Sequence, residues 1–219
     1  MRIHLKLKSN QKIIPFEHQH LLTGTIHKWI GFDNNEHGNV SLYSFSQLQK
    51  GQNTLNGLFF DGDSSFFFSA HNDELIKKVI AGIQSYPNMF CGLEVNEVII
   101  QDNPDFSNRN LFFLGSPIFI KRKINNNIEH ILFDDSRADL CLEDSLKRKM
   151  NIAGLEDESL RIKFDKASPY AKTKMITYDG IKNRTSWCPV IIEGKPETKL
   201  FAWNVGLGNS TGIGFGSIK

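Results

Sequence analysis

Glycines near the carboxyl end of the 219-residue chain have a spacing that suits ligand binding. Five of them fall within the eleven residues 206–216, GLGNSTGIGFG. A glycine backbone can approach a ligand closely, and successive N–H groups can form a concave anion site. The two common nucleotide-binding patterns do not fit, because the third glycine of G-x-G-x-x-G is missing from its place and no G-K-[ST] occurs. The residues alone leave two interpretations: an anion-binding loop, and a tight terminal hairpin that needs positive φ.

Histidines are the other groups suited to chemistry near neutral pH, because an imidazole pKa of about 6.5 lets the ring accept and donate protons. His27 lies in a predicted helix, residues 17–30, and falls well off its apolar stripe of Leu22, Ile26, Trp29 and Ile30. His37 lies in the polar loop GFDNNEHGNV, where a solvated surface role is the alternative to a functional one. His20 lies seven residues before His27, on the same face of the predicted helix.

The sequence predicts neither a metal site nor a disulfide framework. No His or Cys set has metal-ligand spacing, and the three cysteines are odd in number and far apart, which is typical of buried thiols in a reducing cytoplasm. Two carboxylate pairs, Asp134–Asp135 and Asp61–Asp63, fall in predicted turns. No apolar run approaches the roughly 20 residues that span a bilayer. We therefore expect a cytoplasmic protein that binds no membrane and needs no cofactor.

The distribution of charge indicates where an acidic partner would bind. The first thirty residues hold five basic side chains against one acidic, residues 31–110 four against ten, and residues 111–219 seventeen against thirteen. Two tight basic clusters, Lys121–Lys123 and Lys147–Lys149, lie in the last of these segments. Such clusters can neutralise phosphates, although a solvated basic face is an equally good interpretation of either cluster alone.

Two similar sets of elements must position these residues. Alternation predicts a strand over 2–8, and helical periodicity predicts helices over 17–30 and 72–85, the second with Asn72 as its cap. A hairpin is expected from 53 to 70, turning at Asp61–Asp63, and a strand over 95–100. This order, β-α-β-β-α-β, is that of a ferredoxin-like unit.

The second half repeats part of that order without repeating the sequence. It contains a predicted strand over 112–123, a turn at 125–127 with a returning strand, a helix over 137–150, three further strands and a short helix over 196–205. We therefore expect an α+β protein of two ferredoxin-like domains, residues 1–95 and 96–219. The glycine-rich loop would close the second domain.

This arrangement resembles the RAMP superfamily of CRISPR systems, in which a glycine-rich loop closes a tandem ferredoxin-like protein. GLGNSTGIGFG is similar to the loop of the repeat-processing endoribonuclease, the "Cas six" family. Three other segments match in sequence order: PFEHQHLLTGTIHKWI resembles the first helix of that family, LYSFSQL the following strand, and LGSPIFI the start of the second half. The resemblance covers nearly the whole chain.

The resemblance implies that the protein cuts CRISPR repeat RNA into guide RNAs without a metal ion. The 2′-hydroxyl attacks the adjacent phosphorus and the 5′-oxygen leaves, which gives 2′,3′-cyclic phosphate and 5′-hydroxyl ends. His27 matches a place where the family often carries a catalytic Tyr or His, and His37 precedes LYSFSQL as the family's catalytic histidine does. The resemblance thus assigns general acid and base to His27 and His37, without deciding which is which.

The glycine-rich loop would hold the RNA backbone, and the basic clusters would grip a repeat stem. The expected RNA contacts are Gly206, Gly208, Ser210, Gly212, Gly214, Gly216, Lys121, Arg122, Lys123, Lys147, Arg148 and His20. The expected partner is CRISPR repeat RNA, with subunits of a CRISPR effector complex and a second copy of the chain as further partners.

One departure from the family pattern leaves the third catalytic group unassigned. Some members carry a lysine just before the strand that follows the second catalytic residue, and the matching place here, Val40–Ser41, has none. Members of the RAMP superfamily also serve as subunits of effector complexes, so binding of repeat RNA or a guide RNA without cutting is the alternative function. A small-molecule phosphate site at the glycine-rich loop is a third possibility, which the missing fingerprint positions disfavour.

Overall fold

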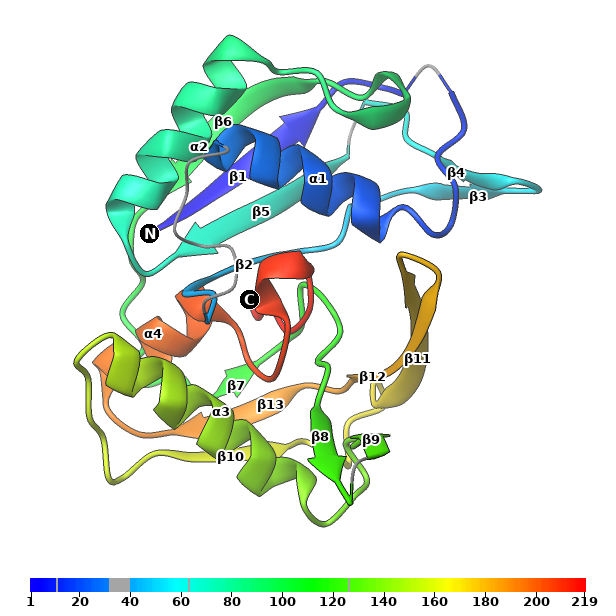
Figure 1. The fold of residues 1–219 in the computed structure, drawn as a ribbon. Helices are drawn as coiled ribbons and strands as arrows, with labels where there is room; N and C mark the ends of the chain where they lie inside the picture. Colours follow the sequence, from blue (N-terminus) through cyan, green and yellow to red (C-terminus); the bar gives the residue numbers. More distant parts are fainter. Residues whose placement is uncertain (11, 32–39, 63, 126) are drawn as a thin grey trace.

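The first half of the chain forms one antiparallel sheet covered on one face by two helices (Figure 1). The computed structural model describes residues 1–10, 12–31, 40–62, 64–125 and 127–219. The strand order is β2-β5-β1-β6, with α1 and α2 packed against each other on the same side. The elements are β1 (Arg2–Leu7), α1 (Gln19–Ile30), β2 (Tyr43–Phe45), β5 (Ser65–Ala70), α2 (Asp73–Ser85) and β6 (Val95–Gln101). The β-α-β-β-α-β order is the predicted one, but β2 takes the place in the sheet that the sequence predicts for residues 53–62.

Local sequence explains the start and packing of these elements. Asn72 caps α2 as expected, because its Oδ1 accepts a hydrogen bond from the Glu74 amide at 2.9 Å. Ile3 and Leu5 alternate along β1 and are fully buried in the first core, with the apolar stripe of α1. Within the described parts of the chain, no helix has both the length and the apolar character needed to cross a membrane.

The predicted hairpin over residues 53–70 is wrong. The strand β4 (Gly57–Phe59) pairs with β3 (Gln52–Thr54), whereas β5 pairs with β1 and β2. After β4 the chain follows the N-terminal segment, where Asn10 Oδ1 accepts a hydrogen bond from the Phe60 amide at 2.7 Å. The phenylalanines of β5 are buried on both of its faces, so this strand needs a neighbour on each side and takes an interior place in the sheet.

The second half repeats the architecture, with the chain end in the place of its fourth strand. Its sheet has the order β10-β13-β7, and residues 217–219 run beside 113–115, where the Phe113 and Lys219 backbones exchange hydrogen bonds of 3.1 and 2.8 Å. The elements are β7 (Leu111–Phe112), α3 (Ala138–Ile152), β10 (Arg161–Phe164), β13 (Val190–Glu193) and α4 (Pro196–Val205). The glycine-rich segment is therefore a connection from a helix to a strand, inside the domain.

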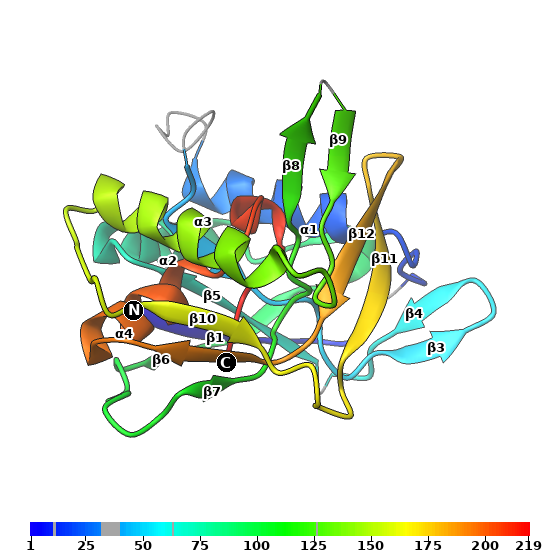
Figure 2. The same ribbon diagram turned by 90° about the horizontal axis from the view of Figure 1, so that it is seen from below.

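Two hairpins are inserted into the second unit and project from it (Figure 2). One joins β8 (Lys121–Ile124) to β9 (Asn127–His130), and the other joins β11 (Lys172–Tyr178) to β12 (Ile181–Trp187). The continuous strand predicted over 112–123 is interrupted between β7 and β8. Pro117 lacks an amide hydrogen, and the space beside Gly115 that a side chain would occupy holds the Phe67 ring of the first half.

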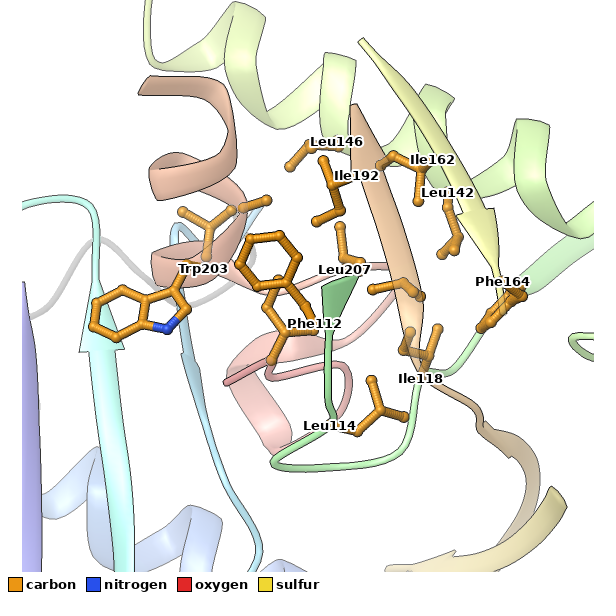
Figure 3. Close-up of a cluster of buried hydrophobic side chains, with 14 of the residues drawn as sticks. Phe112, Leu114, Ile118, Leu142, Leu146, Ile162, Phe164, Ile192, Trp203 and Leu207 are labelled. Atoms are coloured by element: carbon orange, nitrogen blue, oxygen red, sulfur yellow. The ribbon is translucent and has the colours of Figure 1, made fainter. Parts of the chain in front are cut away.

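Each half has its own apolar core. In the second, α3 lays Leu142 and Leu146 against Ile162 of β10 and Ile192 of β13 (Figure 3). Trp203 of α4 lies at the edge of this cluster, towards the first sheet. The last strand of the first sheet pairs with β1 as far as Gln101, beyond the residue 95 at which the sequence places the end of the first domain.

Arg2 joins the two halves. Its guanidinium is 2 % exposed and lies between the rings of Phe67 and Trp203, 3.8 and 3.4 Å from their centroids. Nη2 donates hydrogen bonds of 2.7 Å to the carbonyl oxygens of Trp203 and Ile218. Burial holds the pKa of Arg2 well below its usual value. One side chain from the first strand thus fixes both the end of α4 and the end of the chain.

Candidate functional site

The glycine-rich loop lies where the two halves meet, packed beneath α1 and β2 (Figure 1). All five of its glycines are buried, and neighbouring atoms occupy the space of a side chain at each. A Cβ on Gly212 would meet Ser41 and the Tyr43 hydroxyl, and one on Gly206 would lie 3.0 Å from Ser44 Cβ. Gly214, at φ 88°, faces the Gln19 amide. These glycines therefore permit close packing between the halves, in addition to any contact with a ligand.

Backbone carbonyls of the loop are held by α1. Gln19 Nε2 donates hydrogen bonds to the Ile213 and Gly214 carbonyl oxygens at 2.9 and 3.2 Å. The loop also closes on itself, since the Leu207 amide donates to the Gly216 carbonyl at 2.8 Å. The loop is thus a fixed part of the interface between the halves.

A cavity of about 610 Å³ opens beside the exposed part of this loop. Its walls come from the loop, from the first strand of the β8–β9 hairpin, from α3, and from the segment that precedes β2. The lining residues are Val40, Ser41, Lys121, Arg122, Lys123, Asp144, Ser145, Arg148, Lys149, Gly208, Asn209, Ser210 and Thr211. Five basic side chains against one carboxylate make the cavity suited to a polyanion.

Backbone donors add to the positive character of the cavity. Ser210 has a left-handed conformation, with φ 60° and ψ 35°, and begins a single 3₁₀ turn over Thr211–Ile213. Among the described residues, no acceptor pairs with the amides of Gly208, Ser210, Thr211 or Gly212. Three of these residues line the cavity, which is the place where the sequence predicts an anion site.

The basic side chains of β8 are joined to the loop through Asn209. Its Oδ1 accepts a hydrogen bond from the Lys121 amide at 2.9 Å and one from Arg122 Nη1 at 3.5 Å. Arg122 Nη2 also donates to the Cys141 carbonyl of α3 at 3.0 Å. Loop, hairpin and helix are therefore linked around the cavity, and Figure 2 shows the β8–β9 hairpin rising beside the loop.

His27 is connected to the loop through one tyrosine. Its Nε2 lies 3.2 Å from the Tyr43 hydroxyl, which donates to the Gly212 carbonyl at 3.3 Å. His27 itself is half-buried and is not part of the cavity wall.

Two other predicted residues, Lys147 and His20, lie outside the wall of this cavity. His37 lies outside the described residues; Val40 and Ser41, three and four positions further on, line the cavity. Lys147 faces away from it, 3.8 Å from Glu143, beside a different depression along α3. His20 is exposed near the start of α1.

Sequence reasoning missed several polar groups of the site. Asn209 and Thr211 lie between the glycines of the loop and line the cavity. The glycine spacing indicates a binding loop, but it does not indicate a role for these two side chains. Tyr43 lies in β2, where all three residues are buried. No alternation of buried and exposed residues along this strand therefore distinguishes its hydroxyl as functional. Lys149 belongs to a basic cluster that the sequence does identify, but nothing in the sequence indicates that it is buried.

Fold and site together define the class of protein: an α+β protein of two ferredoxin-like halves with a glycine-rich loop between them, the fold that solved Cas6 and RAMP proteins also have. The family described as "CRISPR associated protein Cas6, C-terminal" matches residues 101–219, which is more than half of the chain. The chain therefore belongs to the Cas6 family, whose known members are endoribonucleases that process CRISPR repeat RNA.

Individual relatives agree with this placement. A CRISPR-associated endoribonuclease-like Cas6 protein of Pyrococcus furiosus is 27% identical over 167 residues, which cover 72% of this chain and 68% of the relative. The solved structure of a Cas6-related protein from the same organism matches with a TM-score of 0.85 at 24% identity, covering 100% of this chain and 97% of that one. A RAMP protein described as binding different RNA substrates matches with a TM-score of 0.85 at 20% identity, covering 100% and 98%. At these identities the two structures establish the fold.

Proposed function

We propose that the protein is a metal-independent endoribonuclease that cuts CRISPR repeat RNA to give guide RNAs. The observation that carries this proposal is the basic cavity in which the loop residues Gly208–Thr211 face Lys121, Arg122 and Arg148. A repeat RNA placed there has its phosphates between unpaired amides and cations. Both kinds of group stabilise the extra negative charge that a phosphorane develops.

The proposed chemistry needs only groups that move protons. One imidazole removes the 2′-hydroxyl proton as the oxygen attacks phosphorus, and another donates a proton to the departing 5′-oxygen. We assign these tasks to His27 and His37. Tyr43 supports this role for His27, because its hydrogen bonds to Nε2 and to Gly212 fix the imidazole relative to the loop.

RNA recognition is proposed for the cavity lining and for the rest of the predicted set. Lys121, Arg122, Lys123 and Arg148 neutralise backbone phosphates, and Gly208 and Ser210 contribute amides. The other glycines of the loop contribute by allowing it to pack closely between the two halves. Lys147 and His20 remain predictions, at the margin of this surface.

The test is incubation of the purified protein with repeat RNA in an excess of chelator. We expect one cut per repeat, with 2′,3′-cyclic phosphate and 5′-hydroxyl ends. A single 2′-deoxy substitution at the cut site should abolish cutting while leaving binding intact, since it removes the nucleophile alone. Cutting that requires magnesium, or that persists on the 2′-deoxy RNA, would overturn the proposal.

A second candidate is a subunit that binds repeat or guide RNA without cutting it. This candidate is favoured by the position of His27, which is half-buried and outside the cavity wall, and by the Pyrococcus furiosus relative, whose name calls it only endoribonuclease-like. The same assay separates the two, because a binding subunit retains the repeat RNA intact. CRISPR effector subunits and a second copy of the chain are the further partners of either candidate.

A further inference from the structure

Lys149 is a buried cation in the wall of the proposed RNA cavity. It lies in the last turn of α3 and is 4 % exposed. Its Nζ donates to the Val205 carbonyl at 3.0 Å, to the Gly206 carbonyl at 3.2 Å, and to Thr211 Oγ1 at 3.0 Å. No carboxylate of the described residues lies within ion-pair distance of this amine. The lysine thus ties the carboxyl end of α4 to the glycine-rich loop.

The surroundings of Lys149 hold its proton weakly. Burial lowers the pKa of Lys149 to about 7. The carbonyl oxygens at the end of α4 carry partial negative charge, but no ionised carboxylate of the described residues pairs with the amine. Both protonation states of the amine are therefore populated near neutral pH, and an anion placed in the cavity favours the charged state.

The two states differ in what they leave for Thr211. An ammonium has three N–H groups and satisfies all three oxygens, so that Thr211 Oγ1 accepts a hydrogen bond and keeps its own hydrogen for another partner. A neutral amine has only two N–H groups and one lone pair. The two carbonyls take the N–H groups, and the Thr211 hydroxyl then donates to the nitrogen. Thr211 is 2 % exposed at the wall of the cavity, and Lys149 leaves its hydroxyl hydrogen free for another acceptor only in the charged state.

We propose that Lys149 and Thr211 form a proton-coupled phosphodiester subsite, in which Lys149 is a positioning residue and the Thr211 hydroxyl donates to a phosphate oxygen of the bound RNA. This inference rests on the proposed RNA-binding function. Binding of RNA then takes up a proton at pH values above about 7, and the affinity falls as the pH rises through the pKa of the free protein.

The other charged groups that line the same cavity as Lys149 are Lys121, Arg122 and Lys123 of β8, and Asp144 and Arg148 of α3. The described parts of the loop, of α4 and of the segment before β2 contribute no titratable side chain to the cavity. Histidine is the remaining source of a pH effect in this range, and the experiment must separate it from the lysine.

The test measures binding of a repeat RNA with a 2′-deoxy cut site between pH 6 and 9 at fixed ionic strength. Calorimetry in buffers of different ionisation enthalpy measures the protons taken up. For the wild type we expect the affinity to fall by up to about tenfold per pH unit above pH 7, with matching proton uptake. Lys149→Met should bind more weakly at pH 6 and lose this slope, and any slope that remains belongs to histidines. Lys149→Arg should lose the slope because a guanidinium keeps its charge.

Thr211 provides a second arm that leaves the lysine in place. Thr211→Ser should bind like the wild type, whereas Thr211→Val should bind several-fold more weakly at pH 6, with each fold checked by its melting temperature. Binding without proton uptake, or equal uptake by Lys149→Met, would overturn the inference while leaving any RNA cutting intact. Proton uptake on binding by a protein that does not cut RNA would overturn the proposed nuclease activity and support the subsite. If repeat RNA does not bind at any pH, both the proposed function and the subsite are overturned.

Discussion

At the scale of single residues, the proposed cutting of RNA depends on the imidazoles of His27 and His37. His27→Ala and His37→Ala should each slow cutting of repeat RNA by about 10²- to 10⁴-fold, because each removes a proton-transfer group. Binding of the 2′-deoxy repeat RNA should stay within a few-fold of the wild type. The measurement is a single-turnover cutting rate beside a binding isotherm. A variant that loses binding and cutting together would assign that histidine to recognition or folding.

Tyr43 should act on cutting through His27. Tyr43→Phe removes the hydroxyl that bridges His27 Nε2 and the Gly212 carbonyl, and it keeps the buried ring against Phe68. The imidazole can then turn or change tautomer, so we expect a cutting rate roughly tenfold lower, since oriented groups lose rate when misplaced. The pH profile of cutting should also shift. An unchanged rate and profile would show that the bridge has no part in positioning His27.

Two neighbouring basic residues offer a matched comparison for RNA recognition. Arg148 lines the cavity, and Lys147 faces away towards Glu143. Arg148→Ala should weaken binding by about tenfold and reduce the salt dependence of log K by about one phosphate contact. Lys147→Ala should change binding much less, although the sequence predicts an RNA contact there. Equal losses in the two variants would mean that RNA covers a wider face of α3 than the cavity.

At the scale of elements, the glycine-rich loop should be sensitive to a single methyl group. Gly214→Ala places Cβ against the Gln19 amide and the Phe45 ring at φ 88°, so we expect a loss of about 2–4 kcal/mol in the free energy of unfolding. Gly154→Ala has a similar φ of 71° with no atom within 4 Å, and strain alone should cost it about 1–2 kcal/mol. Gly24→Ala, inside α1 with open space around it, should gain about 0.5–1 kcal/mol. Chemical denaturation measures all three, and equal losses at Gly214 and Gly154 would contradict the packing role of the loop.

Local signals in the sequence predict most elements and several of their ends. The cap at Asn72 and the helix over Pro196–Val205 follow from such signals, as the structure shows for both. The wrong hairpin over 53–70 has a long-range cause. β5 pairs with β1, which lies some sixty residues earlier in the sequence. No local sequence signal predicts a pairing over that separation.

The site is predictable to a similar extent. Glycines, histidines and clusters of basic residues indicate possible binding or catalysis by their residue type alone. The structure places Lys121–Lys123 and Arg148 beside the loop. Lys149 and Arg148 are adjacent in the sequence and alike in charge, yet one is buried and the other exposed. That difference depends on where α4 ends against α3, which is a property of the folded chain.

At the scale of the whole molecule, Arg2 joins the two ferredoxin-like halves. Arg2→Met keeps much of the apolar contact but leaves the Trp203 and Ile218 carbonyls without a donor, at a cost of about 3 kcal/mol in the free energy of unfolding. The melting temperature should fall by about 6–12 °C. Lys6→Met is the control on the same strand, because its exposed ion pair with Glu97 contributes less than about 1 kcal/mol. Similar melting temperatures for the two variants would contradict a joining role for Arg2.

The central claim is that one place in the molecule, between the glycine-rich loop and the basic wall, holds the phosphate at which the RNA is cut. The most direct test is the structure of the protein bound to a repeat RNA with a 2′-deoxy cut site. We expect the scissile phosphate within hydrogen-bonding distance of the Gly208–Thr211 backbone, with the rings of His27 and His37 on opposite sides of it. A scissile phosphate bound outside this cavity, or out of reach of both imidazoles, would contradict the account.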